Sequence, residues 1–129
     1  MLLEIDTLSV IPIYQQLRDQ VILGIAKGEL VPGESLPTVR QLADELGVNT
    51  MTISKAYNLL KDEGYLITDR RKGSLVRLPD NFTLKEEADL HQTLALLLAQ
   101  GKLHGITKES LLSAIDTIWQ NFEGGNHDD

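Results

Sequence analysis

The fold is decided by residues 36–64, which read LPTVRQLADELGVNTMTISKAYNLLKDEG. Apolar side chains recur in this stretch every three or four residues, in two groups separated by a polar gap. The groups are Val39, Leu42, Ala43 and Leu46, followed by Ile53, Ala56, Tyr57 and Leu60. This spacing predicts two amphipathic helices, each with one face turned toward a core.

Local signals indicate where both helices begin and end. Thr38 and Gln41 form the pattern of a capping box, so we expect the first helix at residues 39–46. Gly47 ends that helix, and Asn49 can cap the second one, which stops at a later glycine. About three residues separate the helices. Two short helices joined by a tight glycine turn predict a helix-turn-helix.

Flanking segments extend this unit on both sides. Before it, helical spacing of apolar residues predicts a helix over residues 12–27, preceded by a short extended segment at residues 4–10. After it, strand-like runs at residues 65–68 and 74–77 flank a polar turn at residues 69–73. This pair predicts a β-hairpin, and a hairpin directly after a helix-turn-helix is a wing.

A break at residues 79–81, with a proline and an asparagine, predicts a domain boundary. We expect residues 1–79 to form a winged helix-turn-helix and residues 80–129 to form a short helical tail. The predicted fold class is therefore mainly α with a small β wing.

Composition excludes several classes of protein. The chain has 129 residues and no cysteine, which rules out a disulfide framework and a thiol nucleophile. No secretory signal or membrane-spanning apolar run is visible, which favours the cytoplasm. Common hydrolase, zinc-protease and phosphate-loop motifs are missing, so we expect no enzyme. His91 and His104 stand apart from any carboxylate cluster, so we expect neither a metal nor a cofactor.

Charge is unevenly distributed along the chain. The net charge of −7 argues by itself against a nucleic-acid partner. Residues 35–77, however, hold seven Lys and Arg against five Asp and Glu, whereas residues 81–129 hold three against eight. A mildly basic segment is thus joined to an acidic tail, and the whole-chain value hides this difference.

We expect the second helix of the helix-turn-helix to enter the DNA major groove. Its outer face and its first turn carry hydroxyl, amide and cationic groups that can contact base edges and phosphates. The preceding helix and the tip of the wing add further cations. The predicted DNA-binding residues are Arg40, Asn49, Thr50, Met51, Thr52, Ser54, Lys55, Arg70, Arg71, Lys72 and Gly73.

These residues also have plainer explanations. Asn49 and Thr52 can serve only to cap the helix, and Lys55 can be an ordinary exposed residue. Arg40 lies in the first turn of its helix, where a cation opposes the helix dipole. A phosphate or guanine partner would explain that position, and an ion pair with Asp44 is the alternative. The basic turn at residues 70–72 would by default be solvated. Because it lies at the tip of a wing, we expect it to contact phosphates or the minor groove instead.

Several motifs within residues 9–78 resemble one family of bacterial regulators. They are PIYQQL at 12–17, GELVPG at 28–33, LPTVRQLA at 36–43, GVN at 47–49, AY at 56–57, Leu60, EGYL at 63–66 and KG at 72–73. In this spacing they resemble the winged helix of the GntR family. Arg40 and Gly73 match an arginine and a wing glycine of that family. Many members carry arginines where this chain has Thr50 and Ser54, so their base preference does not transfer.

The length of the tail narrows the resemblance. About 49 residues follow the wing, too few for the ligand-binding domains of most relatives. This points to the short-tailed YtrA-like branch. The resemblance implies that two C-terminal helices serve dimerisation and that regulated genes often encode ABC transporters.

The tail residues themselves also indicate a partner. Helices are predicted from residue 84 to about 99 and over residues 107–122, with a loop at 101–105 and a frayed end at 124–129. Two such helices cannot bury broad apolar faces on each other alone. They must pack on the winged helix or on a second chain, and we favour the second chain. The predicted dimer-interface residues are Leu94, Leu97, Leu98, Leu111, Ile115, Ile118, Trp119 and Phe122.

We therefore expect a sequence-specific DNA-binding transcriptional regulator that acts as a repressor and binds an inverted-repeat operator as a homodimer. Its partners would be double-stranded operator DNA and a second copy of the chain, and the sequence leaves open whether a small-molecule effector binds. The alternative is a winged-helix module that binds another protein without reading DNA. Salt-sensitive binding that depends on Arg40 and the wing would distinguish the two.

Overall fold

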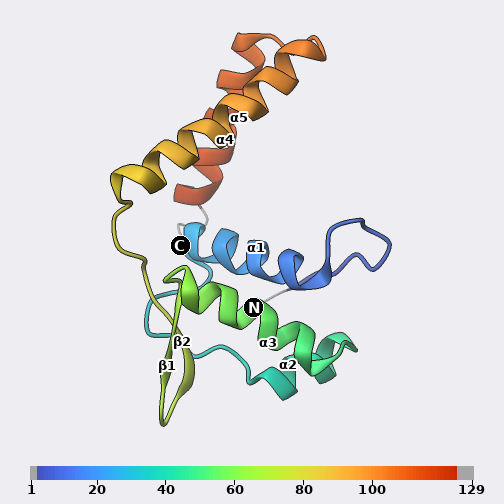
Figure 1. Ribbon diagram of the computed structural model, residues 1–129, viewed down its shortest axis with the longest axis vertical. Helices are drawn as coiled ribbons and strands as arrows, with labels where there is room; N and C mark the ends of the chain where they lie inside the picture. The colour runs from blue at the N-terminus through green and yellow to red at the C-terminus, as the bar shows by residue number, and fades with distance from the viewer. Residues whose placement is uncertain (1–2, 125–129) are drawn as a thin grey trace. The chain divides into compact units, whose positions relative to one another are not determined.

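A computed structural model describes residues 3–124 as five helices and one two-stranded antiparallel sheet (Figure 1). The elements are α1 (Ile13–Ala26), α2 (Val39–Leu46), α3 (Thr50–Asp62), β1 (Leu66–Asp69), β2 (Gly73–Val76), α4 (Leu84–Leu103) and α5 (Lys108–Gly124). The register of the sheet sets Leu66 opposite Val76 and Asp69 opposite Gly73. The predicted fold class, mainly α with a small β wing, is confirmed.

The described chain divides into two compact units, residues 3–79 and residues 80–124. The first unit contains a core of aliphatic side chains and one tyrosine, drawn from α1, α2, α3, the sheet and the connections between them. Its buried members are Leu17, Val21, Leu30, Leu36, Leu42, Ala43, Ile53, Ala56, Tyr57, Leu60, Leu66 and Val76. The four residues predicted to form the inner face of α3 are all among them, so that prediction is confirmed.

The caps predicted for the helix-turn-helix form as expected. Thr38 Oγ1 accepts a hydrogen bond from the Gln41 backbone, and Gln41 Oε1 accepts one from the Thr38 backbone. Gly47 adopts the left-handed conformation, with φ of 68°, and ends α2. Asn49 Oδ1 accepts a 2.7 Å hydrogen bond from the backbone of Met51 at the start of α3. These local bonds place α2 and α3 within a residue of their predicted ends.

Residues 4–10 differ from the prediction of an extended segment. The chain turns at residues 7–8 and bends at 9–11 before α1 begins. The Asp6 carboxylate accepts a hydrogen bond from the backbone of Leu8, and the Ser9 hydroxyl accepts one from the backbone of Ile11. Short polar side chains that bond the backbone two residues ahead favour turns over extended chain, and this outweighs the weak strand pattern.

The predicted loop at residues 101–105 was too long, because α4 continues through Gly101 to Leu103. A glycine inside a helix costs only about 1 kcal/mol relative to alanine. The left-handed residue that reverses the chain is Gly105, with φ of 86°. The final helix extends to Gly124, and the rest of the predicted frayed end lies outside the described residues.

The second unit consists of α4 and α5, and neither helix contains a buried residue. Thr83 and Glu86 form a capping box at the start of α4. In the described chain, no helix has both the length and the hydropathy needed to cross a membrane.

Candidate nucleic-acid interface

The outer face of α3 is open to solvent in its first half. Met51, in the first turn, is 76% exposed, and Thr50 and Asn58 are also exposed. Thr52 and Ser54 are half-buried at the edges of this face. The side chain of Asn49 caps the helix. The polar side chains at positions 50, 52, 54 and 58 make no hydrogen bond to another described residue. Their hydroxyl and amide groups are therefore available to a ligand.

The wing is attached to the segment that precedes α2. The backbone of Val76 donates to Glu34 at 2.9 Å, and the backbone of Leu36 donates to Ser74 at 2.9 Å. The Ser35 hydroxyl donates a 3.1 Å hydrogen bond to the carbonyl oxygen of Lys72, near the tip of the hairpin. Residues 33–36 thus run antiparallel beside β2, joined to it by an isolated bridge between Ser35 and Leu75, which places the wing against the start of α2.

A tyrosine joins α3 to the same segment. The hydroxyl of Tyr57 donates a 2.7 Å hydrogen bond to the carbonyl oxygen of Pro37, one residue before the N-cap of α2. Burial of the ring raises the pKa of Tyr57 to about 12, and the nearby charge of Glu45 adds to this effect. The start of α2, the middle of α3 and the wing are therefore fixed relative to one another by hydrogen bonds within the first unit.

The tip of the wing is organised around Asp69. Its carboxylate accepts hydrogen bonds from the backbone of Lys72 at 2.9 Å and of Arg71 at 2.8 Å. These two donors lower the pKa of Asp69, so the carboxylate stays ionised. Gly73 follows with φ of 82°, a conformation that side chains disfavour. The turn is thereby held while the side chains of residues 70–72 remain exposed.

Four exposed cations of the first unit form no ion pair. Arg40, Arg70, Arg71 and Lys72 make no ion pair or side-chain hydrogen bond with any other described residue. The alternative pairing of Arg40 with Asp44 therefore does not form. Neither α2 nor α3 has an acidic residue in its first turn, so their positive helix ends are not neutralised there. This combination attracts anions.

Lys55 differs from the other predicted contact residues. Its Nζ lies over the aromatic ring of Tyr14 on α1, 4.0 Å from the ring centroid, in a cation–π contact. This contact was not predicted from the sequence. Because the two residues are far apart in the sequence, no local spacing could have indicated the contact.

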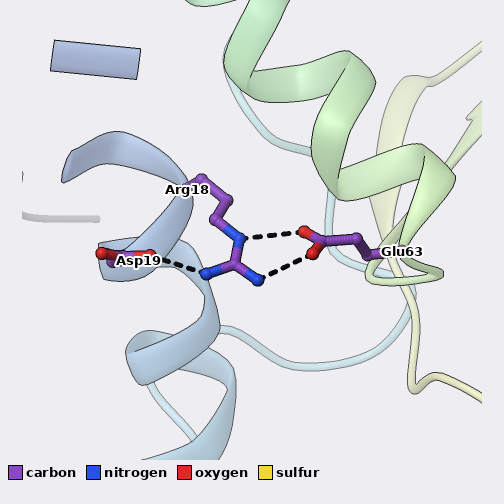
Figure 2. Close-up of polar contacts among 3 residues, drawn as sticks. All are labelled: Arg18, Asp19 and Glu63. Atoms are coloured by element: carbon purple, nitrogen blue, oxygen red, sulfur yellow. Dashed lines mark hydrogen bonds and ion pairs between the residues drawn. The ribbon is translucent and has the colours of Figure 1, made fainter. Parts of the chain in front are cut away.

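A second contact between α1 and α3 was also not predicted. Figure 2 shows the guanidinium of Arg18 directed at the carboxylate of Glu63, which follows the last turn of α3. Arg18 Nε and Nη2 lie 2.9 Å and 2.7 Å from the two Glu63 oxygens, and Arg18 Nη1 lies 2.8 Å from Asp19. The bond to Glu63 is the main cause of the raised pKa of Arg18. This bidentate pair holds α1 along α3.

The predicted dimer-interface residues lie on α4 and α5 and are largely uncovered in the single chain. Leu111 and Phe122 are half-buried, and the other six are exposed. Trp119, which is 60% exposed, packs at 6.1 Å between ring centroids against Phe122 and donates a hydrogen bond to Glu123. Among the described residues, no group of three His, Asp or Glu side chains is placed to hold a metal ion.

Comparisons with known proteins agree with this architecture. Residues 13–76 match the family model for bacterial regulatory proteins of the gntR family. The transcriptional repressor YtrA of Bacillus subtilis strain 168 is 33% identical over 130 aligned residues, which cover 99% of this chain and 100% of YtrA.

Two solved structures extend the comparison. A protein of Listeria monocytogenes EGD-e described as a transcriptional antiterminator superposes with a TM-score of 0.88 at 28% identity, over 100% of this chain and 98% of that one. The DNA-binding domain of AraR, solved in complex with operator ORX1, gives a TM-score of 0.51 at 30% identity over 58% of this chain and 93% of that one. The likeness to YtrA covers the C-terminal helices as well as the wing, so the predicted resemblance is confirmed. The chain belongs to the GntR family of bacterial regulatory proteins.

Proposed function

We propose that this regulator binds an inverted-repeat DNA operator as a homodimer and represses transcription by covering the promoter. The contact region, here named the α2–α3–wing surface, consists of Arg40, the solvent-facing side chains of residues 49–58, and residues 70–73. The observation that carries the proposal is the presence of four exposed cations without an ion pair, on α2 and on the tip of the wing, together with the exposed polar face of α3. Their charges are available to phosphates.

The chemistry of this surface suits a duplex. An α-helix fits the major groove, and side chains in the first turns of the second helix of a helix-turn-helix can reach base edges there. Arg40 and the wing cations would contact phosphates on either side, which positions the protein on DNA without reading its sequence. The AraR domain, whose fold is similar, was solved bound to its operator, which supports this use of the surface.

The apolar faces of α4 and α5 support the homodimer. Trp119 and Ile118 are 60% and 51% exposed, and Leu97 on α4 is 61% exposed. Uncovered apolar area of this kind, including a large aromatic residue, is typical of protein–protein interfaces. Two copies would also present two recognition helices to two half-sites about one turn of DNA apart, so that their contacts add.

We assign no enzymatic activity to the chain and place it in the cytoplasm, where its operator is found.

The competing function is a winged helix that docks another protein and does not read DNA. That function would not require exposed cations on α2 and on the wing, and its partner binding would not show the salt dependence of phosphate contacts.

Selection of bound duplexes from a random pool, with the full chain, tests the proposal. We expect enrichment of one inverted repeat whose half-sites are related by two-fold symmetry, and an affinity that falls as salt rises. The Arg40→Ala variant should recover the same repeat with lower yield, whereas Lys102→Ala on α4 should behave like the parent. Recovery of unrelated sequences with no common repeat would refute sequence-specific binding.

A further inference from the structure

We propose that α3 selects A·T base pairs, with the side chain of Met51 packed on the C5-methyl group of thymine in the major groove. This inference rests on the proposed function, because it requires α3 to lie in that groove. It goes further by assigning the chemistry of the bases that the helix reads.

The first argument is that α3 offers no free charged side chain of the kind that reads a G·C pair. Guanine presents two acceptors in the major groove and is read by Arg or Lys, whereas cytosine presents a donor and is read by Asp or Glu. Between residues 50 and 58 the only cation is Lys55, and the outer face has no acid before Asp62.

The second argument concerns the position of Lys55. Its ammonium lies 4.0 Å from the centroid of the Tyr14 ring, at the side of α3 that packs on α1. Tyr14 and Arg18 are four residues apart and share a face of α1. Because Arg18 is bound to Glu63 by two hydrogen bonds, the helix that carries the ring is fixed along α3. Lys55 is thereby held beside the groove-facing side chains, in a position suited to a phosphate.

The third argument is what α3 does present. Met51 is 76% exposed at the centre of the outer face, although its apolar side chain gains nothing from water. An apolar group at this position can bury itself only on another apolar group, and thymine alone among the bases carries a methyl group in the major groove. Asn58, two helical turns further on, has an unengaged amide that can donate to and accept from adenine.

Removal of the thymine methyl groups tests this proposal. The operator obtained from the random pool is synthesised with each thymine replaced in turn by deoxyuridine, which keeps base pairing and lacks only the methyl group. With the parent protein, we expect one or two positions in each half-site at which the replacement weakens binding about fourfold, the effect of one methyl group that is no longer buried. With Met51→Ser, the same replacements should have no effect. Because Met51 is exposed, this variant should unfold at the parent's temperature.

A second variant tests the role given to Lys55. Lys55→Ala should lower affinity but enrich the same bases from the random pool. If it instead lost preference for a guanine, Lys55 would read bases and the proposal would be wrong. The proposal would equally be overturned if uracil-containing duplexes bound the parent as tightly as the thymine forms. In both cases operator binding itself would persist, so the proposed function would stand; absence of any selected operator would refute that function instead.

Discussion

The hydroxyl of Tyr57 on α3 lies 2.7 Å from the carbonyl oxygen of Pro37, just before the cap of α2. The ring of Tyr57 is 3% exposed and belongs to the core, so one residue both packs the unit and aligns the two helices of the helix-turn-helix. The orientation of Arg40, in the first turn of α2, depends on this alignment.

Substitution Tyr57→Phe should lower the free energy of unfolding by about 1 kcal/mol, the net contribution of one hydrogen bond. Urea denaturation measures this change. Operator affinity should also fall, because the start of α2 loses a contact that places it beside α3. The matched control is Tyr65→Phe, since the half-buried Tyr65 has no side-chain hydrogen bond with a described residue. Equal losses in both variants would show that the Pro37 contact has no special role.

The burial of Tyr57 predicts a dependence on alkaline pH. The pKa of Tyr57 is raised from 10.0 to about 12 by burial, so the folded chain holds the phenolic proton more tightly than the unfolded chain does. The resulting stabilisation is fully present below about pH 10 and is lost as the pH rises to about 12. Urea titrations across this range should show a steeper loss of stability for the parent than for Tyr57→Phe. Parallel curves would contradict the assignment.

The wing should contribute affinity without sequence preference. We expect Arg71→Ala combined with Lys72→Ala to weaken operator binding and to reduce the slope of log affinity against log salt by about 4, because the dimer loses two phosphate contacts in each of its two chains. Filter binding at several salt concentrations measures this slope. Lys102→Ala combined with Lys108→Ala removes the same charge from α4 and α5 and should leave the slope unchanged. A wing variant with the parent's slope would exclude the wing from the interface.

The tail should control the oligomeric state. Trp119→Asp places a charge where we expect an apolar contact between two copies, so sedimentation should show monomers and operator affinity should fall. Val10→Asp is the control, because Val10 is 98% exposed and lies in the first unit. If Trp119→Asp remained a dimer, the interface would have to lie elsewhere than on the face that carries this residue.

Most of the fold could be predicted from the sequence because its signals are local. Thr38, Asn49 and Gly47 act on backbone groups within four residues of themselves, so their pattern alone places the ends of α2 and α3. At Gly101 the local signal was misleading, because α4 continues through a glycine that was predicted to begin a loop. Local preference there is weak, about 1 kcal/mol, and packing decides the outcome.

The site could be predicted only in part for the same reason. Exposed polar residues on one face of α3 follow from helical period, and the basic tip of the wing follows from composition. The contacts of Tyr57 with Pro37, of Lys55 with Tyr14 and of Arg18 with Glu63 each join residues at least 20 positions apart, on segments whose approach depends on the folded core. The pattern of apolar residues identified Tyr57 as inward-facing, but the contact of its hydroxyl with Pro37 and the contact of Lys55 with the ring of Tyr14 follow only from the assembled unit.

The strand-like pairing of residues 33–36 with β2 has a consequence for how chains of this kind can vary in length. One residue inserted between Gly33 and Leu36 would shift the pairing by a position and turn the buried Leu36 toward solvent, because side chains alternate along a strand. Residues added between Arg70 and Lys72 would leave that register intact. Insertions and deletions among related chains should therefore accumulate at the hairpin tip and be absent from the four residues beside it.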